Sequence, residues 1–129
     1  MGHLKTAWVA LVASVIVVFL GWTVPVAAQM MSAQGGLQIV ANQKVCMVTN
    51  MVFPRDQIPV KHAGKTYYGC CENCKKTLGE DAASRTAIDP VSKKSVDKAT
   101  AVIAARDDGS VIYFENQANF NKFKKRNSN

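Results

Sequence analysis

The chain has 129 residues and a formal net charge of +7, from 16 Lys and Arg against 9 Asp and Glu. This length suits one domain or two very small ones. The positive charge is spread along the chain and gathers only at the end, in Lys122, Lys124, Lys125 and Arg126. A nucleic-acid protein needs a basic face with aromatic or motif support, so the composition argues against that class, whereas contact with anionic lipid headgroups stays open.

Residues 1–28 predict a secretory signal peptide. Lys5 is followed by an apolar run from Ala7 to Trp22, and small residues end at Ala28. This is the order of regions in a cleaved signal. An uncleaved membrane anchor is the alternative, but the run is shorter than the roughly 20 residues that a spanning helix needs. We therefore expect a periplasmic or exported protein, anchored to the membrane only if this segment is retained.

A flexible N-terminal segment is predicted over 29–43, which starts polar and includes glycine. Leu37, Ile39 and Ala41 alternate with the residues between them, which is a weak signal for a short strand. A first structured unit follows over 44–80. Its helix is predicted because Cys71, Cys74 and Leu78 are spaced for one helix face. In chain order we expect a turn at Cys46, strands over Ile58 to His62 and Thr66 to Tyr68, and a helix from Cys71 to Gly79.

A second unit, without cysteines, is predicted over 86–125. Asp107–Asp108–Gly109 is a strong hairpin signal because Asp-Gly tolerates positive φ. It separates a strand over 101–105 from a return strand over 111–114. Phe120 and Phe123 are three residues apart, which suits one face of a terminal helix.

The two units resemble each other at an offset of 43 to 45 residues. The stretch Lys65–Cys70 parallels Ser110–Glu115, and Cys46–Thr49 parallels Asp89–Ser92. A period of this size predicts a duplicated strand–strand–helix element. The expected fold class is therefore α+β, with two small tandem copies of one unit.

The cysteines lie only in the first unit, and Glu115 and Asn119 stand where copies of Cys70 and Cys74 would fall. Cys70 and Cys74 are four residues apart, so they share one helix face and both sulfurs can point at one ion. A turn carrying Cys46 can approach from the other side. Soft thiolates select Zn(II), Cu(I) and similar ions over Mg(II) or Ca(II). If the duplication is real, one copy binds metal and the other supports it.

The spacing does not choose between the two metals. Zinc prefers a tetrahedron and so needs a fourth donor, from among His62, Cys71, Asp56 and water. Cu(I) accepts three thiolates without a fourth ligand, and Met47 or Met51 could add a thioether. We expect one Cu(I) or Zn(II) per chain. Cys71, His62 and Met47 are the additional candidate ligands, although a histidine beside a turn is more commonly a surface residue.

Disulfides are the alternative for the same cysteines. Exported chains meet an oxidising environment, and an even number of cysteines is typical of bridged proteins. Cys46–Cys70 together with Cys71–Cys74 is one chemically reasonable pairing. Cys71–Glu72–Asn73–Cys74 also has the spacing of a thiol–disulfide enzyme, but the thioredoxin-like βαβ context is missing. The spacing alone favours metal binding and disulfide formation by these cysteines about equally.

A family resemblance favours the metal. Cys46, followed by Tyr67–Tyr68–Gly69–Cys70–Cys71–Glu72–Asn73–Cys74, resembles the TRASH domain family, whose pattern is one cysteine, a longer gap and then Cys-x-x-x-Cys. That family is a treble-clef-type module linked to heavy-metal sensing, trafficking and resistance. The second unit, with Asp89–Pro90–Val91 and then Ile112–Tyr113–Phe114 before a helix, is similar to the related YHS domain. The resemblance implies Cys46, Cys70 and Cys74 as metal ligands; Cys71 lies outside the pattern.

The expected function is that of an exported metal-binding protein that delivers, sequesters or detoxifies copper or another soft metal. No Ser–His–Asp arrangement, paired acid–base carboxylates or glycine-rich phosphate loop is apparent, so we do not expect an enzyme. The alternative is a structural zinc or disulfide-stabilised interaction module. Such a module would act as an accessory subunit that binds a protein partner in an envelope complex.

Overall fold

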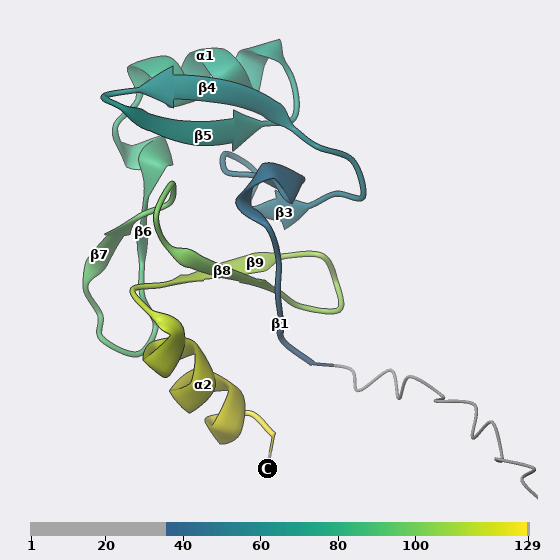
Figure 1. Ribbon diagram of the computed structural model, residues 1–129, viewed down its shortest axis with the longest axis vertical. Coiled ribbons are helices and arrows are strands. Elements are labelled where there is room, and N and C mark those ends of the chain that lie inside the picture. The colour runs from purple at the N-terminus through teal and green to yellow at the C-terminus, as the bar shows by residue number, and fades with distance from the viewer. Residues whose placement is uncertain (1–35, 129) are drawn as a thin grey trace, which may run out of the picture. The chain divides into compact units, whose positions relative to one another are not determined.

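The structure, a computed structural model, describes residues 36–128, which belong to one compact unit of the chain. The fold of this part is mixed α+β, with two helices and several small strand pairs (Figure 1). The predicted signal peptide, residues 1–28, lies outside the described residues. Within residues 36–128, no helix has both the length and the apolar character needed to cross a membrane.

The first half of this part builds two hairpins and a helix. Strands β2 (Val45–Cys46) and β3 (Met51–Val52) form one antiparallel pair. Strands β4 (Ile58–His62) and β5 (Lys65–Gly69) form the second, with a tight turn whose Gly64 has a φ of 74°. Helix α1 (Glu72–Glu80) then packs against β4 and β5 (Figure 1). Helix α1 starts one residue later than predicted because Cys71 is its N-cap, and Gly79 lies inside it.

The second half follows the same plan. Strands β6 (Thr86–Ile88) and β7 (Ser95–Asp97) pair first; the sequence pattern did not predict them as strands, since each has only three residues. Strands β8 (Val102–Ala105) and β9 (Val111–Phe114) form the predicted hairpin, with Gly109 at a φ of 82°. Helix α2 (Gln117–Arg126) ends the described chain and packs against this hairpin.

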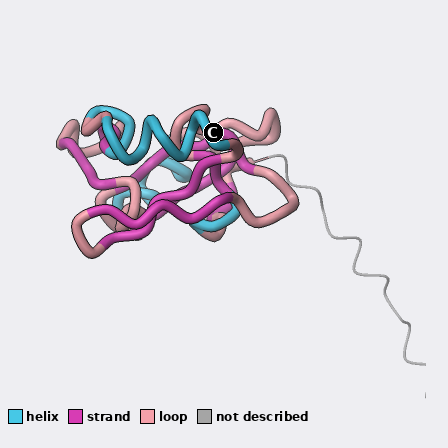
Figure 2. The backbone as a smooth tube through the Cα atoms, turned by 90° about the horizontal axis from the view of Figure 1, so that it is seen from above, coloured by secondary structure: helices cyan, strands magenta, loops and turns pink. Residues whose placement is uncertain are grey.

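Details of the backbone recur between the halves. Each half begins with a short 3-10 turn, Asn42–Lys44 in the first and Ala83–Arg85 in the second. The turn after β2 contains Asn50 with a φ of 55°, and the turn after β6 contains Lys93 with a φ of 61°. Cys71 caps α1 with φ and ψ of −154° and 171°, and Asn116 caps α2 with −160° and 171°. Figure 2 shows both helices among the strands and connecting loops.

One hydrophobic core runs through both halves. Val45, Met47 and Leu78 of the first half share a buried cluster with Ile103 and Tyr113 of the second. A smaller cluster lies under α2, where the rings of Phe120 and Phe123 meet Phe114 edge to face at 5.7 and 5.5 Å between centroids. The two predicted units therefore do not have separate cores.

The segment predicted as flexible, 29–43, is described from Gly36 onward. There, strand β1 (Gln38–Ile39) pairs with β8 and makes a three-stranded sheet, β1-β8-β9. The Val40 N–H also donates to the Ile103 carbonyl at 3.0 Å. The weak alternation of apolar residues over 37–41 is the sequence signal for this strand.

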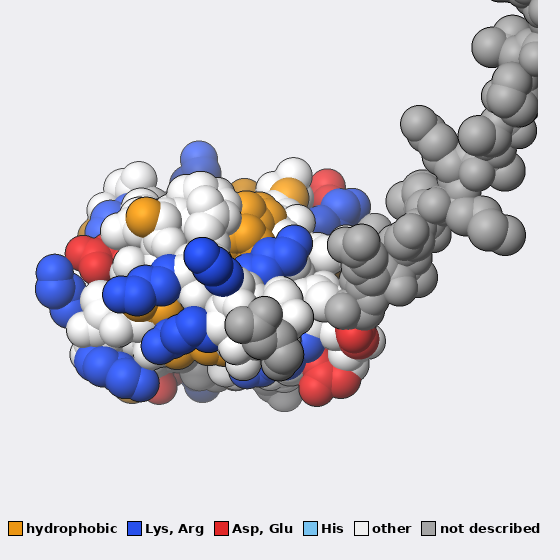
Figure 3. All heavy atoms as spheres, turned by 90° about the horizontal axis from the view of Figure 1, so that it is seen from below, with side chains coloured by type: hydrophobic (Ala, Val, Ile, Leu, Met, Phe, Trp, Pro, Cys, Tyr) orange, Lys and Arg blue, Asp and Glu red, His pale blue; other side chains and the backbone are white. Residues whose placement is uncertain are grey.

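The basic residues do not form a single uniform surface. On the face shown in Figure 3, Lys and Arg side chains are interspersed with hydrophobic and neutral ones, and acidic side chains lie near the margins. Lys124, Lys125 and Arg126 all belong to the last turn of α2, where positive charge is favourable at the carboxyl end of a helix.

Candidate metal centre

Three of the four cysteines meet in space. The Sγ atoms of Cys46, Cys70 and Cys74 all lie within 4.8 Å of one another. Cys46 ends β2, Cys70 follows β5, and Cys74 lies in the first turn of α1. Cys46 and Cys74 are buried, and Cys70 is half-buried. A site of three thiols, open to solvent on one side, is therefore assembled from three elements.

Backbone contacts bring the Cys46 turn to β5. The Met47 N–H donates to the Tyr68 carbonyl at 2.8 Å, and the Cys70 N–H donates to the Cys46 sulfur at 3.4 Å. Gly69 lets α1 approach the strand, because a Cβ there would lie 3.0 Å from Cys74 Cβ and 3.1 Å from Cys74 C. The glycine before Cys70 is therefore needed to place Cys74.

The donor set and its spacing suit a soft metal ion. A tetrahedral zinc with Zn–S bonds near 2.3 Å holds its sulfurs about 3.8 Å apart, and Cys70 Sγ lies 3.6 Å from Cys74 Sγ. All four cysteines are free thiols in the structure. Thiolate donors favour Zn(II), Cu(I) and related ions, so the three cysteines could bind such an ion, and the geometry does not name it.

The three thiols are not electrostatically equivalent. Burial acts to raise the pKa of Cys46, but hydrogen bonds from Thr49 and Cys70 outweigh it and lower the pKa to about 7. Burial and hydrogen bonds with the neighbouring thiols raise the pKa of Cys74 to about 12. As the pH rises, Cys46 is thus the first of the three thiols to lose its proton. A metal must displace the Cys74 proton, so binding strengthens as the pH rises.

Cys71 lies beside this group and has a different role in the structure. It is exposed, and its sulfur accepts the Cys74 N–H at 3.4 Å as the N-cap of α1. Its Sγ lies 3.4 Å from Cys74 Sγ, but it does not belong to the compact group of three. The sequence pattern predicted Cys71 as the first residue of the helix and did not indicate that it caps it.

His62 and Asp56 are not brought into the cluster. His62 ends β4 and pairs with Lys65, whereas Cys70 follows Gly69 at the opposite end of the same hairpin. Five strand residues separate these ends by about 14 Å. Met47 is fully buried in the core, and exposed Asp56 pairs with Lys44 at 2.7 Å.

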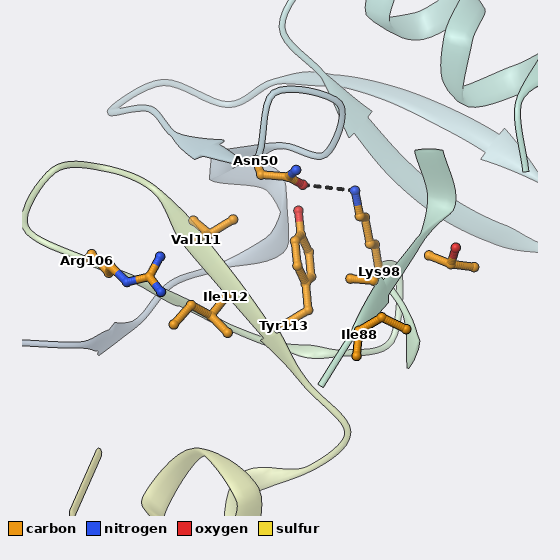
Figure 4. A pocket seen from close by; sticks show the side chains of 9 residues that line it. Asn50, Ile88, Lys98, Arg106, Val111, Ile112 and Tyr113 are labelled. Atoms are coloured by element: carbon orange, nitrogen blue, oxygen red, sulfur yellow. Dashed lines mark hydrogen bonds between the residues drawn. The ribbon is translucent and has the colours of Figure 1, made fainter. Parts of the chain in front are cut away.

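A buried lysine supports the Cys46 turn, and nothing in the sequence pattern indicated it. Lys98, only 5% exposed, follows β7 and donates from Nζ to the Met47 carbonyl at 2.6 Å and to Asn50 Oδ1 at 2.9 Å (Figure 4). Its Nζ lies 5.1 Å from the centre of the Tyr113 ring. Lys98, Asn50 and Tyr113 border a pocket of about 290 Å³ that is also lined by residues of β6 and β9.

In the second half, a carboxylate takes the place of the cysteine cluster. Asp89 is fully buried, and its Oδ1 accepts the N–H groups of Val91 at 2.6 Å and Ser92 at 3.1 Å. Its Oδ2 accepts the Glu115 N–H at 2.7 Å and Asn119 Nδ2 at 2.8 Å. Asp89 thus joins the turn after β6 to the start of α2 through hydrogen bonds alone.

Over residues 36–128, Cys46, Cys70 and Cys74 are the only group of metal-binding side chains that lie this close together. The Glu115 side chain is engaged elsewhere, with its Oε1 3.5 Å from Lys94 Nζ.

No protein-family model, curated protein or solved structure matches the chain.

Proposed function

We propose that this protein binds one soft metal ion, Cu(I) or Zn(II), through Cys46, Cys70 and Cys74, and delivers, sequesters or detoxifies it outside the cytoplasm. The observation that carries the proposal is the meeting of three sulfurs within 4.8 Å, drawn from three separate elements. Three thiols this close, and free of disulfides, provide the donor set that a soft cation requires.

The exposure of the site supports exchange of the ion with a partner. Cys70 is half-buried and Cys71 is exposed, so one side of the cluster is accessible to another molecule. The pKa of Cys46, lowered to about 7, provides a thiolate near neutral pH, so a metal has fewer protons to displace. The proposed role is binding and transfer, without catalysis.

Metal titrations of cysteine variants test the proposal. The whole exported chain, purified anaerobically, should bind one equivalent of Cu(I) or Zn(II) in competition with a coloured chelator. The double variant Cys46→Ser, Cys74→Ser should lose about a thousandfold or more in affinity, because a hydroxyl is a poor ligand for a soft ion. Cys71→Ser is the matched control and should bind within about tenfold of wild type. Wild-type affinity in the double variant would refute the site.

The arrangement of the chain fits a tandem origin, which we include in the proposal. Two treble-clef-like units, one related to TRASH domains and one to YHS domains, would follow a signal peptide over residues 1–28. The recurring turns, hairpins and capped helices support this interpretation. N-terminal sequencing of the exported protein should then begin at Gln29, and a start at Met1 would indicate an uncleaved anchor.

A structural zinc is the second candidate function. Cys46 is fully buried and lies next to Met47 of the shared core, so an ion there would join β2, β5 and α1. In that case the chain would unfold when a chelator removes the metal, and no exchangeable copper would be found. A protein that stays folded without metal and exchanges Cu(I) favours transfer instead.

A further inference from the structure

Lys98 is a buried cation without a carboxylate partner. Its side chain is 5% exposed, and within residues 36–128 it forms no ion pair with Asp or Glu. Its two Nζ acceptors, the Met47 carbonyl and Asn50 Oδ1, are both neutral. Buried charges in proteins are normally paired, so a negative group is to be expected near Lys98.

The candidate for that group is the cysteine site. Both acceptors of Lys98 belong to the turn that directly follows Cys46: Met47 is its first residue and Asn50, whose hydrogen bond to Lys98 is drawn in Figure 4, its last. Burial lowers the pKa of Lys98, and the charge of Cys46 acts in the opposite direction. Burial raises the pKa of Tyr113, whose ring faces Lys98, and the charge of Cys46 raises it further. Lys98 Nζ thus lies against the backbone of the residue that directly follows Cys46, at 2.6 Å from its carbonyl oxygen.

We propose that Lys98 is the counter-charge of the three-thiolate site and biases that site toward a monovalent soft ion. The inference rests on the proposed metal-binding function. Zn(II) bound to three thiolates leaves a site of charge −1 when any fourth ligand is neutral. Cu(I) bound to the same three thiolates leaves a charge of −2. A fixed positive charge on the turn after Cys46 therefore stabilises the copper form about twice as strongly as the zinc form.

The size of the effect follows from the Coulomb interaction. One unit charge acting on another through a partly buried region changes an equilibrium constant by about tenfold. Removing the charge of Lys98 should therefore weaken Cu(I) binding about ten times more than Zn(II) binding. A residue that only held the Cys46 turn in position would weaken both metals by the same factor.

The experiment compares Cu(I) and Zn(II) affinities by chelator competition on the whole exported chain. Lys98→Met removes the charge, and Lys98→Arg retains it. Asn50→Asp keeps the hydrogen bond to Nζ but places a carboxylate against it, which cancels the charge without removing the lysine. Lys76→Met is the matched control, since Lys76 is exposed on α1, the helix that carries Cys74. Circular dichroism establishes that each variant is folded.

We expect Lys98→Met and Asn50→Asp to lower the Cu(I) affinity about ten times more than the Zn(II) affinity. Lys98→Arg and Lys76→Met should leave the ratio of the two affinities close to that of wild type. Equal losses for both metals, or no loss, would overturn the role of Lys98 while leaving the metal site intact. If Lys98→Met does not fold, Asn50→Asp decides the question. A wild-type chain that binds neither ion would refute the proposed function, and this inference with it.

Discussion

At the scale of single residues, Asp89 shows how much one buried carboxylate contributes to the stability of the fold. Its four hydrogen bonds hold the turn after β6 against the start of α2. Burial acts to raise the pKa of Asp89, but the hydrogen bonds from Glu115, Asn119, Val91 and Ser92 outweigh it and lower the pKa below its usual value. A carboxylate that accepts this many bonds is more stable ionised, so the folded chain favours its charged form.

We predict that Asp89→Asn destabilises the protein by about 2–4 kcal/mol, because an amide cannot accept the bonds made by both carboxylate oxygens. The pKa of Asp89 is lower in the folded chain than in the unfolded chain. Its contribution is therefore present above about pH 4 and is lost as the pH falls further. Chemical denaturation between pH 7 and pH 2.5 should show that the difference in the free energy of unfolding between wild type and variant becomes smaller in acid.

Asp56→Asn is the control for this prediction. Asp56 is exposed, and its ion pair with Lys44 lies at the surface, so its loss should change the free energy of unfolding by less than about 1 kcal/mol. If the difference in the free energy of unfolding between wild type and Asp89→Asn stayed constant down to pH 2.5, the ionised carboxylate would not be what stabilises the fold.

At the scale of elements, the two helices begin in the same way with different capping residues. Cys71 and Asn116 have nearly the same backbone angles, and the side chain of each accepts the N–H of the residue three positions on. Asparagine is among the strongest N-caps, whereas a thiol is a weak acceptor. The first helix thus has a weaker cap of the same geometry.

We predict that Cys71→Asn, which copies the second helix, leaves the metal-free protein as stable as wild type or more stable by up to about 1 kcal/mol. Cys71→Ala removes the cap acceptor and should cost about 0.5–1 kcal/mol. Thermal unfolding with a chelator present measures both variants. If the asparagine variant were the less stable of the two, the cap would not be what Cys71 provides.

At the scale of the whole molecule, the shared core makes the candidate metal centre depend on the second half. Met47 and Leu78 pack in one cluster with Ile103 and Tyr113, and each large buried side chain contributes about 1.5–3 kcal/mol. Lys98 also reaches across from the second half to the Cys46 turn. The first unit alone would expose this apolar surface and lose the support under Cys46.

We predict that a fragment of residues 29–85 does not fold alone and binds Cu(I) at least about a hundredfold more weakly than the whole chain, because binding must then drive folding. The whole chain should unfold in one cooperative transition followed by circular dichroism and by fluorescence. Two separate transitions, or a fragment with the full affinity, would show that the units are independent.

The local patterns of the sequence were sufficient to predict several of the helices and strands. The Asp-Gly turn, its flanking strands and the helix carrying Cys74 depend on neighbouring residues, and they were predicted close to where they lie. The four-residue spacing of Cys70 and Cys74 places both sulfurs on one side of a helix start. The sequence by itself thus determined an α+β chain with a candidate three-cysteine group.

Only the tertiary structure decided what surrounds that group. Lys98 meets Met47 across 51 residues of sequence, and no local period encodes such a contact. The register of β4 with β5 puts His62 at the far end of the hairpin, and the shared core joins the two units that the repeat pattern predicts. These outcomes depend on packing between distant segments, where burial, excluded volume and charge act together on residues that the sequence keeps apart.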